Sequence, residues 1–268
     1  MISGLVKPSS GEILYQGKRI DQFDSDEKRF YHSQVQMIFQ DPYETLNPRF
    51  RVIDTVAEGP RALKLWPENE IVSRVDDILN AVGLSPLKYA ERYPHELSGG
   101  ERQRVGIASA LVMEPQMVIA DEPLSMLDVS IRAGILVLLK KLALERNFSC
   151  IYVSHDLSIL GHIADRLMIM YLGQAVEVGP TRDVIQNPKH PYTRALISAV
   201  PVPDPRSRRA VPNIIGDISR PIDPPPGCRF TLRCPYSDET CSQTFLKLDM
   251  NQGDKHLTAC HRQDALDS

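Results

Sequence analysis

Four short apolar runs, each of strand length, occur along the first two thirds of the chain. They cover residues 35–39, 117–120, 150–154 and 166–172. Nearly continuous apolar runs are typical of strands that are covered on both faces, as in a parallel sheet. The pattern therefore predicts a wound parallel sheet.

Helical periodicity fills the intervals between these runs. Residues 72–84 place apolar side chains on one helical face, and residues 130–147 form a second such pattern that ends in a basic turn and Asn147. Residues 41–111 carry no good strand, so we expect a mostly helical insert there. Because strands and helices alternate along the chain, the sequence predicts an α/β fold.

Prolines mark the end of this pattern. Eleven of the 21 prolines fall between Pro180 and Pro226. The stretches at residues 200–212 and 220–227 cannot form a regular helix or a central strand, because proline lacks a backbone N–H. We therefore predict two domains: residues 1–187, with a helical subdomain at about residues 41–111, and a small C-terminal extension at residues 188–268.

Composition and charge exclude several classes of protein. A hydrophobic share of 42% with 24% charged residues is typical of a globular protein, and a net charge of -3 gives no basic footprint for nucleic acid. No apolar run approaches the roughly 20 residues that a membrane span needs, and the first residues do not form a signal peptide. We expect a cytoplasmic chain whose five cysteines are reduced thiols or metal ligands.

The segment HELSGGERQR has the pattern of a helix start. Ser98 followed three residues later by Glu101 is a capping box. Gly99 and Gly100 would let a ligand approach the backbone, where the helix N-terminus offers free N–H groups to an anion. From these residues alone, both a simple helix start and a phosphate contact stay open.

Polar residues follow three of the predicted strands. Asp121 and Glu122 end the run MVIADE, and ligands of open α/β sheets bind beyond the carboxyl ends of the strands. An Asp in this place can hold Mg²⁺ while a neighbouring Glu deprotonates the attacking water, although acidic pairs at strand ends are also common without such a role. His155 and Gln40 follow two other strands, and each means little alone.

Five segments in this order, FQDP, LSGGERQR, MVIADEP, SMLD and VSHD, resemble the Q-loop, signature, Walker B, D-loop and H-switch of an ABC-transporter ATP-binding subunit. The resemblance covers nearly the whole chain. It implies an ABC-type nucleotide-binding domain, which is a parallel-sheet P-loop NTPase core with a helical subdomain. In that family ATP is sandwiched between the P-loop of one cassette and the signature of the other.

The resemblance also implies roles for individual residues, with ATP and Mg²⁺ as cofactors. Gln40 would touch Mg²⁺ and the attacking water, and Asp121 would hold Mg²⁺. Glu122 would be the general base, and His155 would contact the γ-phosphate.

Further roles follow from the signature and the D-loop. Ser98, Gly99 and Gly100 would meet the γ-phosphate that a partner cassette holds. Asp128 would belong to the D-loop that links the two ATP sites.

The sequence departs from the family pattern at three places. Leu124 and Met126 replace the usual Thr and Ala, which leaves the acidic residues untouched. The P-loop, G-x-x-x-x-G-K-[ST], is absent: Gly11 is one residue too far from Gly17, and Arg19 stands where Ser or Thr would take Mg²⁺. Because GEILYQGKR resembles the strand pair that follows the P-loop helix, we expect a domain that is incomplete at the N-terminus, without Walker A.

The segment NPKHPYTRALISAVPVPDP, at residues 187–205, resembles the one that follows the cassette in ATP-binding subunits of oligopeptide, dipeptide and nickel importers. A short amphipathic helix at residues 192–200 accounts for its shape but not for the literal match. The tail therefore points to a peptide importer.

Four cysteines follow in the last 41 residues, separated by five, six and eighteen residues: Cys228, Cys234, Cys241 and Cys260. This spacing fits a zinc knuckle poorly, whereas four thiolates can also hold an iron–sulfur cluster. The family resemblance implies a [4Fe–4S] cluster rather than zinc. Unligated thiols stay open as an interpretation, and His256 and His261 are alternative ligands.

The function implied by the resemblance is that of the ATPase subunit that energises import of oligopeptides or dipeptides, peripheral on the cytoplasmic face of the cell membrane. Its partners would be a second ATP-binding cassette, two membrane-spanning permease subunits and, indirectly, an extracytoplasmic peptide-binding protein, with no nucleic acid. The missing P-loop leaves an alternative, a truncated, non-hydrolysing cassette that only donates its signature motif to a partner's ATP site. A chromosome-organising ATPase would need long heptad coiled coils, which the sequence does not contain.

Overall fold

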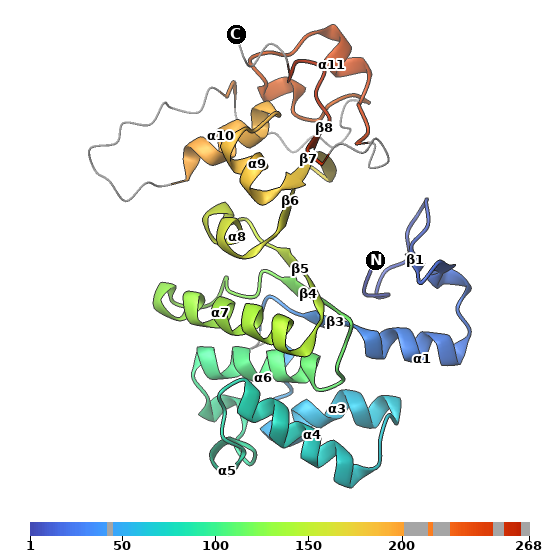
Figure 1. The fold of residues 1–268 in the computed structure, drawn as a ribbon, viewed down its shortest axis with the longest axis vertical. Coiled ribbons are helices and arrows are strands. Elements are labelled where there is room, and N and C mark those ends of the chain that lie inside the picture. Colours follow the sequence, from blue (N-terminus) through green and yellow to red (C-terminus); the bar gives the residue numbers. More distant parts are fainter. Residues whose placement is uncertain (42–44, 201–213, 217–225, 249–254, 264–268) are drawn as a thin grey trace. The chain divides into compact units, whose positions relative to one another are not determined.

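The computed structural model describes residues 1–41, 45–200, 214–216, 226–248 and 255–263. The chain forms two compact units, Met1–His155 and Asp156–Ser268 (Figure 1). The predicted division after residue 187 rests on the proline-rich stretches that follow it and stays a prediction. None of the helices within the described ranges is long and apolar enough to cross a membrane.

The first unit is built on a three-stranded parallel sheet with the order β3-β4-β5. Its strands are β3 (Val35–Ile38), β4 (Met117–Asp121) and β5 (Ser149–Val153), each close to the predicted bounds. Ile38 pairs with Ala120, and Ala120 pairs with Tyr152, so the three carboxyl ends lie at one edge of the sheet. This edge is where the loops that carry the candidate site begin.

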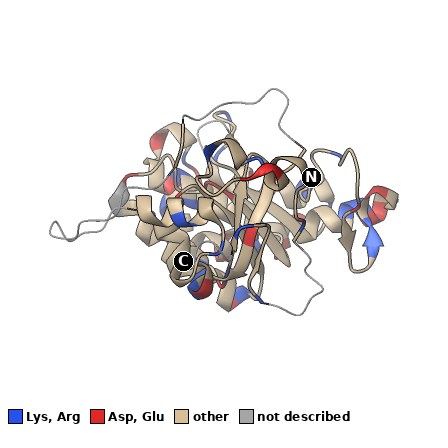
Figure 2. Cartoon of the chain, turned by 90° about the horizontal axis from the view of Figure 1, so that it is seen from above, with Lys and Arg blue, Asp and Glu red and all other residues tan. Residues whose placement is uncertain are grey.

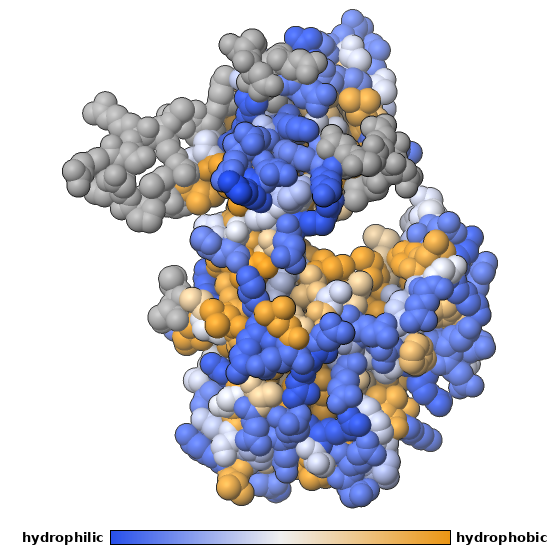
Figure 3. Space-filling view, viewed as in Figure 1, coloured by the Kyte–Doolittle hydropathy of each residue, from blue (hydrophilic) through white to orange (hydrophobic). Residues whose placement is uncertain are grey.

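Coverage of this sheet differs from the prediction of strands buried on both faces. Val118 and Ala120 of β4 are fully buried, but Ile151 and Val153 of β5 are 37% and 47% exposed. Within the described chain, β5 pairs with β4 alone. Apolar surface is accordingly visible around these strands in Figure 3.

Helices and 3₁₀ turns form most of the rest of the first unit, and the stretch predicted to be mostly helical contains α3 to α6. The α6 helix buries Val105 and Ile107 and contacts β3, α3, α4 and α7. These helices and 3₁₀ turns are η1 (Ile20–Gln22), α1 (Ser25–Gln34), α3 (Val52–Leu63), α4 (Glu68–Ala81), α5 (Pro86–Tyr89), η2 (Pro94–Glu96), α6 (Gly99–Leu111) and α7 (Val129–Arg146).

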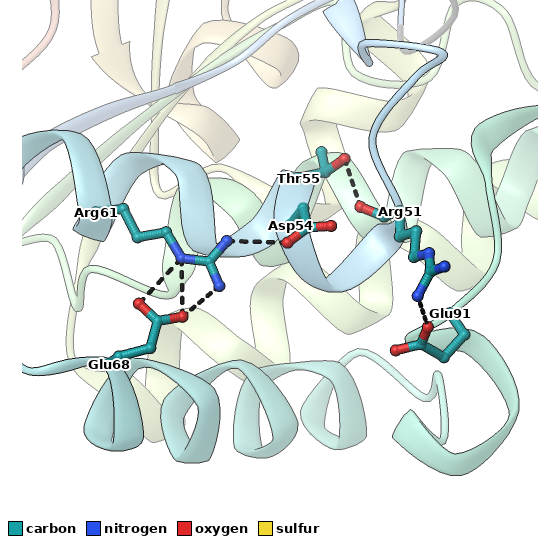
Figure 4. Close-up of polar contacts among 6 residues, drawn as sticks. All are labelled: Arg51, Asp54, Thr55, Arg61, Glu68 and Glu91. Carbon is teal, nitrogen blue, oxygen red and sulfur yellow. Dashed lines mark hydrogen bonds and ion pairs between the residues drawn. The ribbon is translucent and has the colours of Figure 1, made fainter.

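Ion pairs join the exposed sides of these helices (Figure 4). The Arg61 guanidinium of α3 reaches Asp54 Oδ1 at 3.0 Å on its own helix, and its Nε donates to both carboxylate oxygens of Glu68, the first residue of α4, at 3.0 and 3.2 Å. Arg51 pairs with Glu91 in the same way. Because such exposed pairs contribute about 0–1 kcal/mol each, the apolar faces of the helices supply most of the stability.

The N-terminal strand pair is an antiparallel hairpin of β1 (Leu14–Tyr15) and β2 (Lys18–Arg19), as predicted. Gln16 and Gly17 form its turn with φ values of 50° and 79°. Two successive residues with positive φ match a type I′ turn, for which glycine is favoured at the second position.

The second unit contains an antiparallel sheet with the order β6-β7-β8, formed by β6 (Arg166–Tyr171), β7 (Gln174–Pro180) and β8 (Leu257–Thr258). The prediction that residues 166–172 belong to a parallel sheet is wrong. Leu172 and Gly173, with φ values of 45° and 79°, form a two-residue turn that sends β7 back along β6. Met168 and Met170 are 54% and 55% exposed and alternate with buried neighbours, as in a strand with one covered face.

An aromatic cluster forms the centre of this unit. The rings of Tyr171, Tyr192 and Phe230 lie 4.7 to 5.3 Å apart, and they connect β6, α10 and the segment that carries the cysteines. The helices and the 3₁₀ turn are α8 (Leu157–Ile163), α9 (Thr181–Gln186), α10 (Pro191–Ala199), η3 (Thr231–Arg233) and α11 (Glu239–Gln243). The predicted amphipathic helix corresponds to α10, whereas the proline-rich stretches 201–212 and 220–225 lie outside the described residues.

A buried carboxylate connects three segments of this unit. Glu177 of β7 is 0% exposed and accepts the backbone N–H groups of Lys189 at 2.8 Å and His190 at 2.9 Å. Its other contact is His256 Nε2 at 2.7 Å, 79 residues away in the chain. Gly179 leaves room for this histidine, because a Cβ at that position would lie 2.9 Å from the His256 ring.

Acidic and basic side chains are mixed along most of the described chain rather than gathered into one basic stripe (Figure 2). This distribution agrees with the nearly balanced formal charge of the sequence.

We expect Glu177→Ala to lower the free energy of unfolding of the second unit by about 3 kcal/mol or more, because each buried donor left without an acceptor costs about 1–3 kcal/mol. Urea unfolding combined with amide hydrogen exchange in β7 measures the effect. The matched control is Glu239→Ala at an exposed position of α11, for which a change within about 0.5 kcal/mol is expected. Equal effects of the two substitutions would contradict the role given to Glu177.

Candidate functional site

The turn after β4 places Glu122 in an unusual backbone conformation. Its φ is 41°, in the left-handed region, while its N–H still donates to Val153 O at 2.9 Å and so extends the ladder with β5 by one residue. Ser125 then donates to Glu122 O from both its backbone N–H and its hydroxyl. A non-glycine residue held at positive φ by its surroundings is typical of functional turns.

Two side chains from neighbouring loops converge on the Glu122 carboxylate. Gln40, which follows β3, donates from Nε2 to Glu122 Oε2 at 3.1 Å. His155, which follows β5, lies with Nδ1 at 3.0 Å from Glu122 Oε1. The structure therefore joins three of the predicted site residues, taken from three separate strands, into one cluster.

This cluster can activate a water molecule. A carboxylate accepts protons, and an amide on one side with an imidazole on the other fixes its orientation. Asp121, the last residue of β4, is half-buried next to this cluster and offers the carboxylate oxygens that Mg²⁺ prefers.

The signature segment begins α6 with the predicted capping box. Ser98 is the N-cap and its Oγ accepts the Glu101 N–H at 3.4 Å, while Glu101 Oε2 accepts the Ser98 N–H at 2.8 Å and the Ser98 hydroxyl at 2.7 Å. Ser98 is exposed and Gly99 is half-buried. The hydrogen bonds that the structure gives Ser98 lie within this helix start.

The Glu101 carboxylate is held in its ionised form. Hydrogen bonds from the Tyr89 hydroxyl at 2.7 Å and from the Ser98 backbone and hydroxyl lower the pKa of Glu101 from 4.5 to about 2. The negative charge therefore stays at the N-terminus of α6, where the helix dipole favours it.

Gly100 has a packing role in addition to any ligand contact. It is buried, and a Cβ at this position would lie 3.1 Å from Ile131 Cγ2 of α7. The absence of a side chain therefore lets α6 and α7 approach each other.

Asp128, the predicted D-loop residue, is the exposed N-cap of α7. The loop before it is held by Arg132, whose guanidinium donates to Leu127 O at 2.8 Å and to Ser125 O at 3.4 Å. Sequence reasoning missed this contact, since an arginine one turn into a helix is usually a solvated residue. Arg132 thus connects the D-loop with the turn that begins at Glu122.

The four cysteines of the C-terminal extension line one cavity in the second unit. Its volume is about 20 Å³, and its other lining residues include His190, Phe230 and His261. Burial raises the pKa of every one of these thiols, to about 11 for Cys260. The structure thus brings together the four residues predicted as metal ligands.

Side chains that line one cavity hold a metal ion only if their donor atoms lie at the right distances from one another. In the part of the chain that the structure describes, no group of three or more His, Cys, Asp or Glu side chains is positioned to hold a metal ion. A cavity of this size holds about one water molecule. The metal site therefore stays a prediction, supported by the convergence of four sulfur donors.

Known families match both parts of the chain. Residues 1–125 match the ABC transporter family, and residues 176–241 match the family described as oligopeptide/dipeptide transporter, C-terminal region. Over 268 residues the chain is 44% identical to the oligopeptide transport ATP-binding protein OppF of Escherichia coli strain K12, an alignment that covers 99% of this chain and 79% of that protein. The chain belongs to the family of ABC-transporter ATP-binding proteins of oligopeptide transport.

Other relatives of this oligopeptide-transport ATPase family agree. OppF of Haemophilus influenzae is 44% identical, with 97% of this chain and 78% of that protein covered. Among solved structures, cbiO1 from Clostridium perfringens, part of the ABC transporter complex cbiONQ, matches with a TM-score of 0.62 and 32% identity over 69% of this chain and 72% of that one. The cassette MJ0796, bound to ADP and Pi, matches with a TM-score of 0.59 and 27% identity over 68% and 78%.

Family membership confirms several predictions. The fold is that of an ABC-type nucleotide-binding domain, an α/β P-loop NTPase, and the chain is by family an ABC-type ATPase that uses ATP and Mg²⁺. An ABC importer ATPase of this kind works with permease and ATPase partner subunits. The roles of individual site residues stay predictions.

We expect the stability of the first unit to fall more steeply between pH 4.5 and pH 2 in the wild type than in Glu101→Gln. The folded-state pKa of Glu101 is lowered to about 2, so the stabilisation by its carboxylate is present above about pH 4.5 and is lost as the pH falls toward 2. Denaturant unfolding across this pH range measures the difference, and Tyr89→Phe, which removes one donor, is expected to lie between the two. Parallel curves for wild type and Glu101→Gln would contradict the expectation.

Proposed function

We propose that this chain energises the import of oligopeptides or dipeptides across the cytoplasmic membrane by hydrolysing ATP. Two findings support the substrate class: the match of residues 176–241 to the peptide-transporter C-terminal region, and the oligopeptide-transport relatives that align with nearly the whole chain. The proposed place of work is the cytoplasmic face of the membrane, where the chain would be a peripheral subunit.

The observation that carries the proposed chemistry is the position of Glu122 between Gln40 and His155. In this proposal Glu122 is the general base that takes a proton from the attacking water. Gln40 would contact Mg²⁺ and orient the water, and His155 would contact the γ-phosphate. Asp121 would hold Mg²⁺, which would supply charge neutralisation at the phosphates.

The signature would act on a different ATP molecule. Ser98, Gly99 and Gly100 begin α6, whose free backbone N–H groups suit a γ-phosphate held by a second cassette. Asp128 then connects the two ATP sites through the D-loop, and Arg132 holds that loop in place. The exposed position of Ser98 supports this division between two chains.

The further partners in this proposal are two membrane-spanning permease subunits and, indirectly, an extracytoplasmic peptide-binding protein. The permease contact would lie on the helices between Gln40 and the signature. No contact with nucleic acid is proposed.

A second candidate function rests on the lack of a G-x-x-x-x-G-K-[ST] segment in the 268 residues. In P-loop NTPases this segment supplies the backbone N–H groups and the lysine that hold the phosphates. Without them, Glu122 would face no held phosphate, and the chain would only lend its signature to a partner's ATP.

One pair of variants separates the two candidates in a transporter reconstituted with permease, partner cassette and peptide-binding protein. We expect both Glu122→Gln and Ser98→Arg to reduce ATP-dependent peptide uptake by about 100-fold or more, the typical contribution of a general base in the first case. Uptake of labelled peptide into proteoliposomes is the measurement. Glu145→Gln, an exposed carboxyl near the end of α7, is the matched control and should transport normally.

Other results of these experiments also distinguish the two candidate functions. Normal uptake by Glu122→Gln together with failure of Ser98→Arg would support the signature-donor function. A lack of tight, Mg²⁺-dependent ATP binding by the 268-residue chain alone would agree with it. Normal uptake by both variants would contradict both candidates.

We further propose that the four cysteines of the C-terminal extension hold a [4Fe–4S] cluster, with a single zinc ion as the alternative. Support comes from the donor set, since four cysteines of the extension line the same cavity. When bound, either group would crosslink the extension as a structural centre.

Anaerobically purified protein distinguishes these options. We expect a brown protein with visible absorbance and about four iron atoms per chain, and Cys234→Ser should lose most of this iron because it removes one of four ligands. Cys150→Ser, which changes the cysteine of β5, is the control and should keep the iron. Equimolar zinc without colour would establish the alternative, and metal-free protein would contradict both.

A further inference from the structure

His190 is a buried imidazole next to the cysteine cavity. It is 1% exposed, caps the N-terminus of α10 and lies 5.9 Å from the Phe230 ring, measured between ring centroids. It lines the same cavity as Cys228, Cys234, Cys241 and Cys260. Neither the proposed ATPase chemistry nor the four-sulfur ligand set uses this side chain.

The hydrogen bonds of the ring define its tautomer. His190 Nδ1 accepts the backbone N–H of Tyr192 at 3.1 Å, so Nδ1 carries no proton. A neutral imidazole without a proton on Nδ1 has its proton on Nε2, which makes Nε2 a donor.

The Nε2 donor faces a cysteine sulfur. It lies 3.9 Å from Cys228 Sγ, inside the cavity lining. The backbone of the same residue is fixed independently, because the His190 N–H donates to the buried Glu177 carboxylate at 2.9 Å. Three contacts, to Glu177, Tyr192 and Cys228, thus hold the ring in one place.

We propose that His190 is a positioning residue of the four-cysteine site, whose Nε2–H donates a hydrogen bond to the Cys228 sulfur. This inference rests on the metal centre proposed above. A hydrogen bond to a ligating thiolate stabilises its negative charge, retains the metal more firmly and, in an iron–sulfur cluster, raises the reduction potential. The segment KHPYT would then connect the cysteine site with β7.

Two conservative variants separate this role from the capping role. The side-chain amide of Asn lies at about the distance of Nδ1 from the backbone, so His190→Asn can cap α10 but does not reach Cys228. The amide of Gln lies at about the distance of Nε2, so His190→Gln can donate to Cys228 but is a poorer cap. A purely structural histidine would make the Gln variant the worse of the two.

The test uses the full chain reconstituted anaerobically with ferrous iron and sulfide, and in parallel with Zn²⁺ alone. We expect His190→Asn to release its metal to a chelator about 10–100-fold more readily than the wild type, the usual cost of losing such a supporting partner, and to show a lower reduction potential in the iron form. His190→Gln should stay close to the wild type in both measurements. Equal behaviour of wild type and His190→Asn, or a Gln variant as weak as the Asn variant, would overturn the inference.

A matched control comes from the same helix. Thr193 is 0% exposed, and its hydroxyl has no hydrogen-bond partner among the described residues. Thr193→Val therefore perturbs the interior of α10 without touching the cavity, and it should release metal as the wild type does. Faster release by this variant as well would show that any disturbance of α10 suffices, and would overturn the specific role of His190.

A metal-independent measurement keeps the two proposals apart. Nitrogen-15 NMR of the metal-free protein reports directly which ring nitrogen of His190 carries the proton. The Nε2–H tautomer is expected, and a proton on Nδ1 would overturn the inference whatever the metal content. If the wild type takes up neither iron nor zinc but shows the Nε2–H tautomer, the proposed metal centre fails while the donor contact to Cys228 is supported.

Discussion

The parallel pairing of β3, β4 and β5 is the constraint on which the candidate ATPase site depends. Parallel strands have their carboxyl ends at the same edge of a sheet, so the loops that follow them begin side by side. Gln40, Glu122 and His155 are separated by 82 and 33 residues in the chain, yet this register places all three within hydrogen-bond distance. A shift of β4 by one residue would turn Glu122 away from both partners.

The second unit depends on a different kind of contact, a buried carboxylate that serves three segments. Two backbone N–H groups and one imidazole would otherwise need water as their hydrogen-bond partner. The Glu177 carboxylate takes the place of that water. Its partners come from the start of α10 and from the segment before β8. These contacts hold both segments beside β7. The Tyr171, Tyr192 and Phe230 rings form a separate apolar contact between β6, α10 and the segment that carries the cysteines.

Local signals in the sequence predicted local structure well. Ser98 and Glu101 form the capping box that their spacing indicates, and Asn147 ends α7 with a φ of 53°, as expected of a helix C-terminus. Both features depend on residues at most a few positions apart. The antiparallel pairing of β6 was missed although its signal was present, since the Leu172-Gly173 turn is short enough to favour a hairpin over a crossover.

Contacts over long sequence distances were the part that sequence reasoning could not supply. Nothing near Glu177 in the chain marks it as buried, because its partners lie 12 to 79 residues away. Arg132 and His190 are similar cases, each identified only by the atom that its side chain reaches. The sequence shows which side chains can donate or accept a hydrogen bond. The packing of the fold decides which partner each of them meets.

By itself, the sequence determined the strands of the parallel sheet, the start of α6, the order of the ABC motifs and the relationship to peptide-import ATPases. Each of these is encoded in residues that are close together or in a fixed order. Only the tertiary structure decided which of those residues meet. It joined Gln40, Glu122 and His155, and it gathered four cysteines around one cavity beside His190. The physical reason is that hydrogen bonds and burial act over a few ångströms in space, whatever the number of residues between the partners.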